Sequence, residues 1–329
     1  MHVNLSGGVS KVKNKSFVLI LVVLLLSGLL LGGCGGSSEG ESITRLSFGT
    51  GGTSGVYYPI GGGMASLINK YVENVDCTAE VTGASIENNR LVDLNEMQLG
   101  MSNADIDYYA YKGMDPFDKP TQIRIIGSLF QTGMQAVVTK DITSWEDLRG
   151  KRVSVGPPGG SNRRMTLLIL EKYGITEEDF KPYDLSFTES VEAMGDHNLD
   201  AACILSGLPA AAVMDITTNL DVKLLPIDEE VLDSLLEEYS YFSKFVIPAN
   251  YYNNEDAVLS LGITNELFTN EEQDEEIIYE VTKAIFEHLD ELCEIHQLAE
   301  QITSEDAVNS SVPFHPGAIK YWKEVGLME

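Results

Sequence analysis

Gly49-Thr50-Gly51-Gly52-Thr53-Ser54-Gly55 connects a short strand-like segment, residues 45–48, to a segment of helical apolar periodicity that begins at Tyr57. Its four glycines permit a tight turn and let a ligand approach the backbone closely. Thr53 and Ser54 add hydroxyl groups, and the N–H groups in the first turn of the following helix have no partner within that helix. The pattern therefore predicts a strand–loop–helix unit that holds a small anion.

Two nucleotide-binding alternatives fail on spacing. A dinucleotide fingerprint requires glycine at the sixth position counted from Gly49, where this chain has Ser54. A phosphate loop requires Lys followed by Ser or Thr after its last glycine, whereas Val56 and Tyr57 follow Gly55. A glycine-rich turn without a ligand remains the alternative for this loop taken alone.

The amino terminus indicates export. Three lysines precede an apolar run at residues 17–31, which is short for a membrane span of ~20 residues. Leu31-Gly32-Gly33-Cys34 resembles the bacterial lipobox, so we expect a lipoprotein signal peptide at residues 1–33 and lipidation of Cys34. Residues 34–42 are rich in glycine and serine, which is typical of a flexible tether. An ordinary signal anchor is the alternative.

The composition restricts the class of partner. The 329-residue chain has a formal net charge of −28, which becomes −31 without the three lysines of the leader. Nucleic acid and anionic membrane surfaces are therefore poor partners. Cys77 and Cys203 lie in strand-like stretches, which favours buried free thiols over a disulfide. The residues after the leader suffice for about two domains.

From residue 43 onward, short apolar strands alternate with amphipathic helices, which predicts an α/β fold with largely parallel sheets. We expect strands at 45–48, 76–81, 99–103, 123–128, 134–139, 152–155, 200–205, 221–227 and 258–264. We expect helices near 57–72, 85–95, 163–173, 209–217, 229–238, 272–296 and 316–325.

A second glycine loop, Gly156–Asn162, follows the strand at 152–155 and precedes a helix from Arg163. It repeats the arrangement of the first loop. Ligands of open α/β sheets bind at the carboxyl ends of the strands. Two such units therefore predict two lobes that close around one small anion.

Several motifs together resemble the TAXI solute receptors of TRAP transporters. They are Gly49–Pro59, Thr82–Asn88, Leu99–Asp105, Gly156–Gly159, Gly207–Pro209, Ile247-Pro248 and Phe314–Ala318, in this order over residues 43–329. The chain departs from the family at Gly159-Gly160-Ser161, where Gly-Ser-Gly is usual, and at Asn103-Ala104-Asp105, where Gln-Ser-Asp is common.

The resemblance implies the type II periplasmic-binding-protein architecture, with two α/β lobes and a hinge of two crossing segments. Lobe 1 is expected to comprise residues 43–136 and 258–329, and lobe 2 residues 137–257. The crossings are expected near 134–140 and 246–264.

The resemblance also implies the ligand contacts. These are Thr53, Ser54, Gly55, Val56, Tyr57 and Ser85 from lobe 1, and Ser161, Asn162 and Arg163, with Ser206 nearby, from lobe 2. Asp105 is a further candidate, as a contact for an ammonium group of the substrate. Hydroxyls and helix N-termini suit a carboxylate, and the guanidinium of Arg163 can grip one through two parallel hydrogen bonds. The alternatives are that Arg163 and Arg164 are solvated and that Asp105 caps a helix.

These features predict a lipid-anchored, extracytoplasmic binding protein that delivers a carboxylate-bearing solute to the cation-coupled permease of a TRAP transporter. Glutamate, glutamine, 2-oxoglutarate and other small organic acids fit the resemblance, and we expect a monomer without a cofactor. The alternative is a sensory or scavenging module of the same fold that signals to a membrane kinase.

Catalysis has little support in the sequence. Neither Gly-x-Ser-x-Gly nor Ser-x-x-Lys occurs around Ser161. His288, Cys293 and His296 are spaced so that they do not share one helix face, which argues against a metal site. We therefore expect no catalytic residues and no bound metal.

Overall fold

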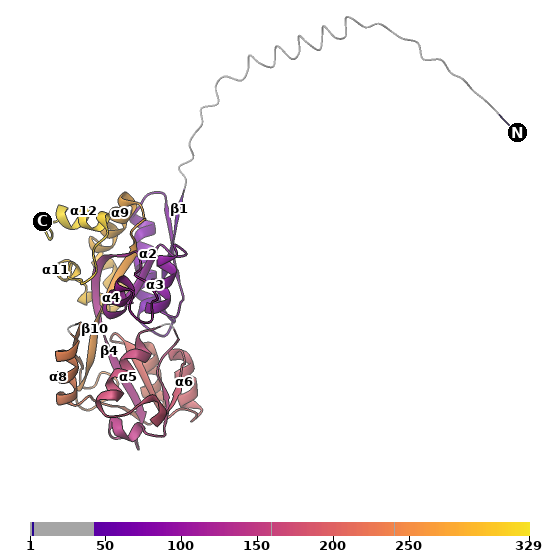
Figure 1. Ribbon diagram of the computed structural model, residues 1–329, viewed down its shortest axis with the longest axis vertical. Helices are drawn as coiled ribbons and strands as arrows, with labels where there is room; N and C mark the ends of the chain where they lie inside the picture. The colour runs from indigo at the N-terminus through magenta and orange to yellow at the C-terminus, as the bar shows by residue number, and fades with distance from the viewer. Residues whose placement is uncertain (1, 3–42, 159, 240) are drawn as a thin grey trace, which may run out of the picture. The chain divides into compact units, whose positions relative to one another are not determined.

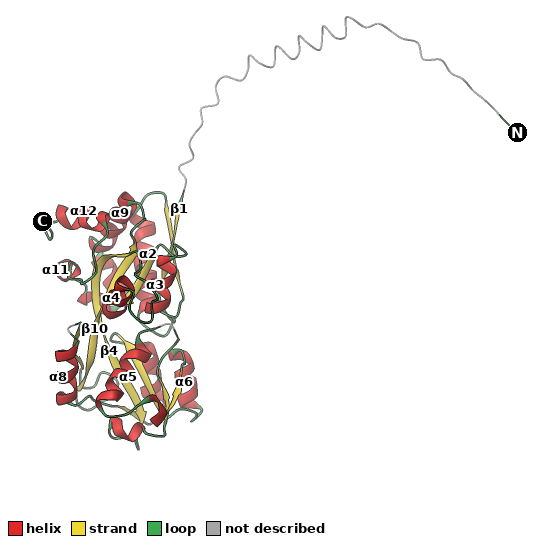
Figure 2. Cartoon of the chain, viewed as in Figure 1, coloured by secondary structure: helices red, strands yellow, loops and turns green. Residues whose placement is uncertain are grey.

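The computed structural model describes residues 2, 43–158, 160–239 and 241–329, so the expected signal peptide, the lipidation of Cys34 and the tether lie outside the described residues. Residues 43–329 form one compact unit. Figures 1 and 2 show that this unit consists of two α/β lobes joined by long strands. In the part of the chain that the structure describes, no helix has both the length and the apolar character needed to span a bilayer.

The strands of the described residues form one continuous sheet. They are β1 (Thr44–Gly49), β2 (Val75–Glu80), β3 (Leu99–Asn103), β4 (Ile123–Thr139), β5 (Arg152–Ser154), β6 (Lys181–Tyr183), β7 (Ala201–Ser206), β8 (Val222–Leu224), β9 (Phe242–Ile247) and β10 (Val258–Asn270). Lobe 1 has the order β2-β1-β3-β10-β4, and lobe 2 has the order β6-β5-β7-β4, with β8 on β4 and β9 on β10.

Both lobes repeat one strand pattern. In lobe 1, β1 is parallel to β2 and β3, and β10 is antiparallel to β3. In lobe 2, β5 is parallel to β6 and β7, and β4 is antiparallel to β7. Each lobe therefore contains three parallel strands followed by an antiparallel strand that comes from the other lobe.

The helices cover the faces of this sheet (Figure 2). They are α2 (Tyr57–Tyr71), α3 (Ser85–Asp93), α4 (Ala104–Lys112), α5 (Asn162–Lys172), α6 (Phe187–Gly195), α7 (Ala211–Asn219), α8 (Glu229–Glu238), α9 (Glu275–Phe286), α10 (Leu289–Ile295), α11 (Ser304–Ala307) and α12 (Pro316–Glu324), with single 3-10 turns at Trp145–Leu148, Glu177–Asp179 and Gln297–Gln301. Lobe 1 is packed around Phe48, Ile60 and Trp322, and lobe 2 around Trp145 and Leu170.

β10 changes lobes within its expected range, 246–264, and β4 changes lobes just before its expected range, 134–140. β10 pairs with β9 over Val258–Ile263 and with β3 over Asn265–Thr269, so it changes lobes near Thr264. β4 pairs with β7 from Gly133 onward. Residues 134–136 and 258–263 therefore belong with lobe 2, whereas the expected boundaries assign them to lobe 1.

The reason is that β4 is one strand where the sequence predicts two. Its middle residues, Gln131–Gly133, stay extended because they pair with Gly262–Thr264 of β10. The two crossing strands thus support each other at the point where both change lobes.

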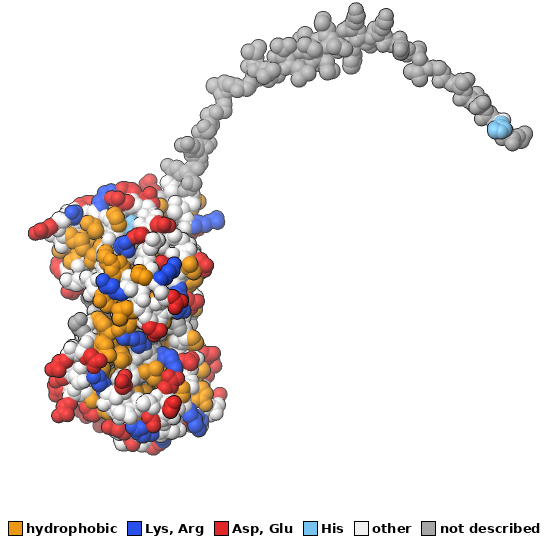
Figure 3. Space-filling view, viewed as in Figure 1, with side chains coloured by type: hydrophobic (Ala, Val, Ile, Leu, Met, Phe, Trp, Pro, Cys, Tyr) orange, Lys and Arg blue, Asp and Glu red, His pale blue; other side chains and the backbone are white. Residues whose placement is uncertain are grey.

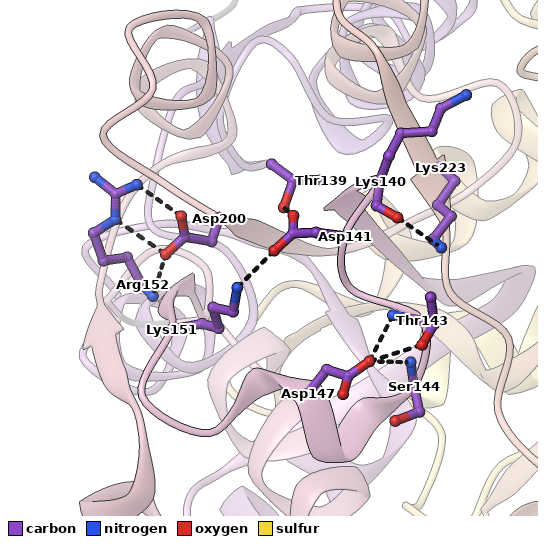
Figure 4. Close-up of polar contacts among 10 residues, drawn as sticks. All are labelled: Thr139, Lys140, Asp141, Thr143, Ser144, Asp147, Lys151, Arg152, Asp200 and Lys223. Atoms are coloured by element: carbon purple, nitrogen blue, oxygen red, sulfur yellow. Dashed lines mark hydrogen bonds and ion pairs between the residues drawn. The ribbon is translucent and has the colours of Figure 1, made fainter.

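A charged cluster at the amino ends of β5 and β7 is structural (Figure 4). Arg152 Nη2 lies 2.7 Å from Asp200 Oδ1, and Lys151 Nζ lies 2.7 Å from an oxygen of Asp141. Backbone N–H groups of Thr143 and neighbouring residues donate to Asp147 and hold its pKa below the usual range. These acids are engaged with neighbours of the same lobe, so the cluster fixes the local chain path.

The surface of the described unit is strongly acidic. Figure 3 shows Asp and Glu side chains over both lobes on the face that is drawn. Cys77 and Cys203 are buried free thiols, as the sequence predicts. His315 precedes α12, and its Nδ1 accepts the N–H of Gly317 at 3.1 Å, which orders the start of this helix.

Candidate functional site: a cavity between the lobes

A cavity of about 190 Å³ lies between the lobes. It is located at the carboxyl ends of β1, β3 and β7, where the glycine loops and helix starts gather. Its lining is formed by Gly51, Gly52, Gly55, Val56, Tyr57, Val81, Thr82, Ala84, Ser85, Asn103, Thr132, Pro157, Gly160, Ser161, Asn162, Ser186, Phe187, Leu205 and Ser206. Both lobes thus contribute to one site, as expected from the two glycine loops.

Four helices without a side-chain cap start at this cavity, and two of them, α2 and α5, come from opposite lobes and have no acidic residue in their first turn. Val56 precedes α2 and Ser161 precedes α5, and both residues line the cavity. Neither helix has a side-chain cap or an acidic residue in its first turn. The N–H groups of a first turn lack partners within the helix and carry the positive end of its dipole. The site therefore offers donors and positive potential without a cationic side chain.

Asn103 connects the helix starts around the cavity. Its Oδ1 accepts the hydroxyl of Ser85, at the start of α3, at 3.1 Å, and it accepts the hydroxyl of Ser161 from the other lobe. Its Nδ2 donates to Asn265 Oδ1 at 2.9 Å, and the phenol of Tyr57 donates to the same oxygen. Burial raises the pKa of Tyr57, so this phenol remains protonated and keeps donating.

One buried hydroxyl in the lining, that of Ser206, has no hydrogen-bond partner among the described residues. This residue is 1 % exposed. A buried hydroxyl without a partner costs free energy, which a bound solute can recover. The side chain of Asn162, in contrast, is occupied because its Nδ2 donates to Val155 O at 2.7 Å and to Cys203 O at 2.8 Å.

The structure brings most of the predicted contacts together. Those in the lining are Gly55, Val56, Tyr57, Ser85, Ser161, Asn162 and Ser206. Thr53 and Ser54 do not line the cavity: Thr53 is exposed, and the hydroxyl of Ser54 accepts that of Thr188 at 3.0 Å across the lobes. Ser54 therefore contributes to the contact between the lobes.

Arg163 and Asp105 also lie outside the lining. The guanidinium of Arg163 pairs with Glu177 and with Asp184, at 3.3 Å from the latter, on the outside of lobe 2. Arg164 forms the contact between lobes instead, with its Nη1 at 2.8 Å from Asp105 Oδ2. Successive helical residues point about 100° apart, which separates the two arginines.

Asp105 is the second residue of α4, whereas the residue at the N-cap position is Asn103, whose side chain forms no capping hydrogen bond. Burial raises the pKa of Asp105 to about 6, although the neighbouring Arg164 and the backbone N–H groups of this first turn, which donate to the carboxylate, lower it. The guanidinium of Arg164 also lies 4.2 Å from the centre of the Tyr109 ring. The ion pair and the cation–π contact therefore connect the two lobes beside the cavity.

The sequence prediction missed Asn103, Thr132, Phe187 and Leu205 in the lining. Phe187 had a readable signal, because Ser186 and Glu189 have the spacing of a capping box and form one at the start of α6. Thr132 had none, because it falls between two segments that were expected to be separate strands.

Comparison with known proteins agrees with this architecture. The sequence model of the NMT1-like family matches residues 48–326. A protein of Bordetella bronchiseptica RB50 has 14% sequence identity and a TM-score of 0.53, over 88% of this chain and 90% of that one. The binding-protein component of an ABC phosphonate transporter from Pseudomonas aeruginosa has 10% identity and a TM-score of 0.52, over 80% of each chain. At these identities the likeness shows the fold, which is that of the periplasmic binding proteins.

Proposed function

The chain belongs to the NMT1-like family, and from that premise and the cavity between its lobes we propose that it is an extracytoplasmic solute-binding protein. A fold shared with the binding component of a phosphonate transporter supports a binding role. The lining also supports it, because it includes the first turns of α2 and α5 and the unpartnered hydroxyl of Ser206, and among the described residues it shows no general base paired with a nucleophile.

The solute carries a carboxylate. The observation that carries this proposal is the pair of uncapped N-termini, α2 from lobe 1 and α5 from lobe 2, that face one cavity. Each helix terminus stabilises a nearby negative charge by about 0.3–2 kcal/mol. An anion held from both sides favours the closed form over the open one, so binding and closure are coupled.

The sequence motifs support delivery of the bound solute to the permease of a TRAP transporter. The motifs from Gly49–Pro59 to Phe314–Ala318 resemble the TAXI receptors, and the lipobox-like sequence at Cys34 supports a lipid anchor on the outer face of the cell membrane. In this role the protein works as a monomer and needs no cofactor. Loss of uptake of the bound solute on deletion of the gene tests this role, and unchanged uptake would favour a sensory module.

Identification of the bound solute tests the binding proposal. The purified protein is denatured, the released small molecules are identified by mass spectrometry, and the emptied protein is titrated calorimetrically with the acid and with its amide. We expect the amide to bind at least ~10-fold more weakly, because charge-assisted hydrogen bonds are roughly twice as strong as neutral ones. Equal affinities would contradict a carboxylate site.

A further inference from the structure

Apolar side chains form most of the cavity wall away from Asn103, namely Val56, Val81, Ala84, Pro157, Phe187 and Leu205. Thr82, Ser186 and Ser206, which carry hydroxyl groups, also line the cavity. Among the described residues in the lining, none carries a charged side chain. A second charge on the solute would therefore face apolar surface, where an unpaired charge is strongly disfavoured.

The cavity has few free acceptors for an ammonium group, which has three donors to satisfy. Asn103 Oδ1 already accepts two hydroxyls. Thr132 Oγ1 accepts the amides of Asn103 and Asn265, each at 3.2 Å. The buried Asp105 lies outside the lining and pairs with Arg164 at 2.8 Å.

The side chains at three helix starts around the cavity are linked to one residue, Asn103. Ser85 at the start of α3 and Ser161 before α5 donate to the same oxygen of Asn103. Tyr57, the first residue of α2, is joined to Asn103 through Asn265. Three helix starts thus converge on a single side chain, which suits one carboxylate better than two separated ones.

The cavity is partly open to solvent, and its volume indicates the size of the part of the solute that it can enclose. Its volume of about 190 Å³ is somewhat larger than the roughly 150 Å³ of an apolar cavity that holds one benzene molecule. A solute on the order of six to ten non-hydrogen atoms therefore fits.

From this wall we infer that the solute is a small monocarboxylate whose remainder is uncharged and largely apolar. The inference rests on the proposed function and restricts the class of solute that the site binds. The carboxylate lies beside Asn103 and hydrogen-bonds the first turns of α2 and α5. The remainder packs against Phe187 and Leu205. Amino acids and dicarboxylates bind more weakly because each places a second charge on the apolar wall.

Calorimetric titration of the emptied protein with matched compounds tests the inference. The probes are butanoate, pentanoate and hexanoate, each compared with the 2-amino acid and the α,ω-dicarboxylate of the same chain length and with its amide. We expect at least one monocarboxylate to bind 10-fold or more tightly than its three matched compounds. An amino acid or dicarboxylate that binds as tightly would overturn the inference and leave the carboxylate site in place. If no acid binds more tightly than its amide, the proposed function fails as well.

Substitution of Phe187 provides an independent readout. Phe187→Arg places a cation on the apolar wall, whereas Phe187→Leu keeps the wall apolar and serves as the control. We expect Phe187→Arg to raise the affinity for the dicarboxylate relative to the monocarboxylate by 10-fold or more, and Phe187→Leu to leave the ratio unchanged. The same ratio in both variants would show that the solute does not extend along this wall.

Discussion

Ser206 illustrates how a single side chain can be reserved for a ligand. Its hydroxyl is buried in the cavity lining and has no partner among the described residues. Most buried polar groups in folded proteins are hydrogen-bonded, so such an exception calls for a partner that comes from outside.

We expect Ser206→Ala to weaken solute binding by roughly 3- to 10-fold, which is the range of one net hydrogen bond. The free energy of unfolding of the emptied protein should stay the same or rise, because no protein contact is lost. Calorimetry and urea unfolding measure the two effects. Ser154→Ala is the control: Ser154 Oγ lies 2.7 Å from Ser190 Oγ, so this change should lower stability and spare affinity. If Ser206→Ala lowered the free energy of unfolding and left the affinity unchanged, Ser206 would not contact the solute.

Arg163 and Arg164 form a natural matched pair, because they are adjacent and have different partners. Arg163→Gln removes exposed ion pairs, so we expect affinity to change by less than ~2-fold. Arg164→Gln leaves the buried carboxylate of Asp105 without its cation in the closed form, so we expect affinity to fall at least ~10-fold. Calorimetric titration of both variants measures the difference.

Asp105→Asn combined with Arg164→Gln completes the cycle. Removal of both charges should restore much of the affinity, because no unpaired carboxylate is left to bury on closure. Additive losses in the double variant would mean that the two residues act independently of each other.

At the scale of the element, the crossing point of β4 and β10 is built on glycines. Gly133 pairs with Gly262 where the strands change lobes. A Cβ at Gly133 would lie 2.0 Å from Phe245 Cδ1, and one at Gly262 would lie 3.0 Å from Phe245 Cβ. The close approach of this phenylalanine, rather than an unusual φ, explains the glycines.

Gly133→Ala should therefore lower the free energy of unfolding by about 1–3 kcal/mol, because Phe245 must move to admit a methyl group. Gly195→Ala is the control, since a Cβ at Gly195, the last residue of α6, meets nothing within 4 Å. That change should raise stability by about 0.5–1 kcal/mol. Urea unfolding measures the change in the free energy of unfolding of both variants. Similar changes would show that Phe245 can move aside without cost.

The elements around the cavity differ in how well the sequence predicts them. α2 and α5 are readable because glycine loops precede them and apolar periodicity follows. α6 was missed although its capping box is visible in Ser186–Glu189. The sequence could not predict that Arg164, and not Arg163, pairs with the other lobe. This difference depends on which face of α5 meets Asp105. Local pattern predicts helix starts, whereas contacts between distant segments depend on the assembled fold.

At the scale of the whole molecule, burial of Asp105 makes stability depend on pH. Its pKa is raised to about 6, with burial as the main cause and Arg164 acting in the opposite direction. The nearby Asp107 and Glu266 also have raised pKa values because of burial. An acid with a raised pKa binds a proton in the folded state that the unfolded state has lost, so its contribution falls as pH rises through this interval.

We therefore expect the stability of the native protein, relative to Asp105→Asn, to fall by about 1–3 kcal/mol between pH 4 and pH 7. Above pH 7 the difference should stay constant, because Asp105 is then ionised in both states. Urea unfolding at one-unit pH intervals measures it. Asp107 and Glu266 titrate in both proteins, and because the charge of Asp105 helps to raise the pKa of Glu266, the measured difference includes this coupling. A difference that grows with rising pH would contradict burial as the dominant effect.

The direction of β1 determines at which end of lobe 1 the preceding segment is attached. This strand begins at Thr44 and reaches the cavity loop at Gly49, so its two ends lie about 20 Å apart. Whatever is joined to Ile43 is thus attached at the pole of lobe 1 remote from the cleft. Both rims of the cleft therefore lie at the end of lobe 1 opposite to Thr44. In the receptor role that we propose, this leaves both lobes accessible to one membrane partner, which can distinguish the closed form from the open form by the separation of the lobes.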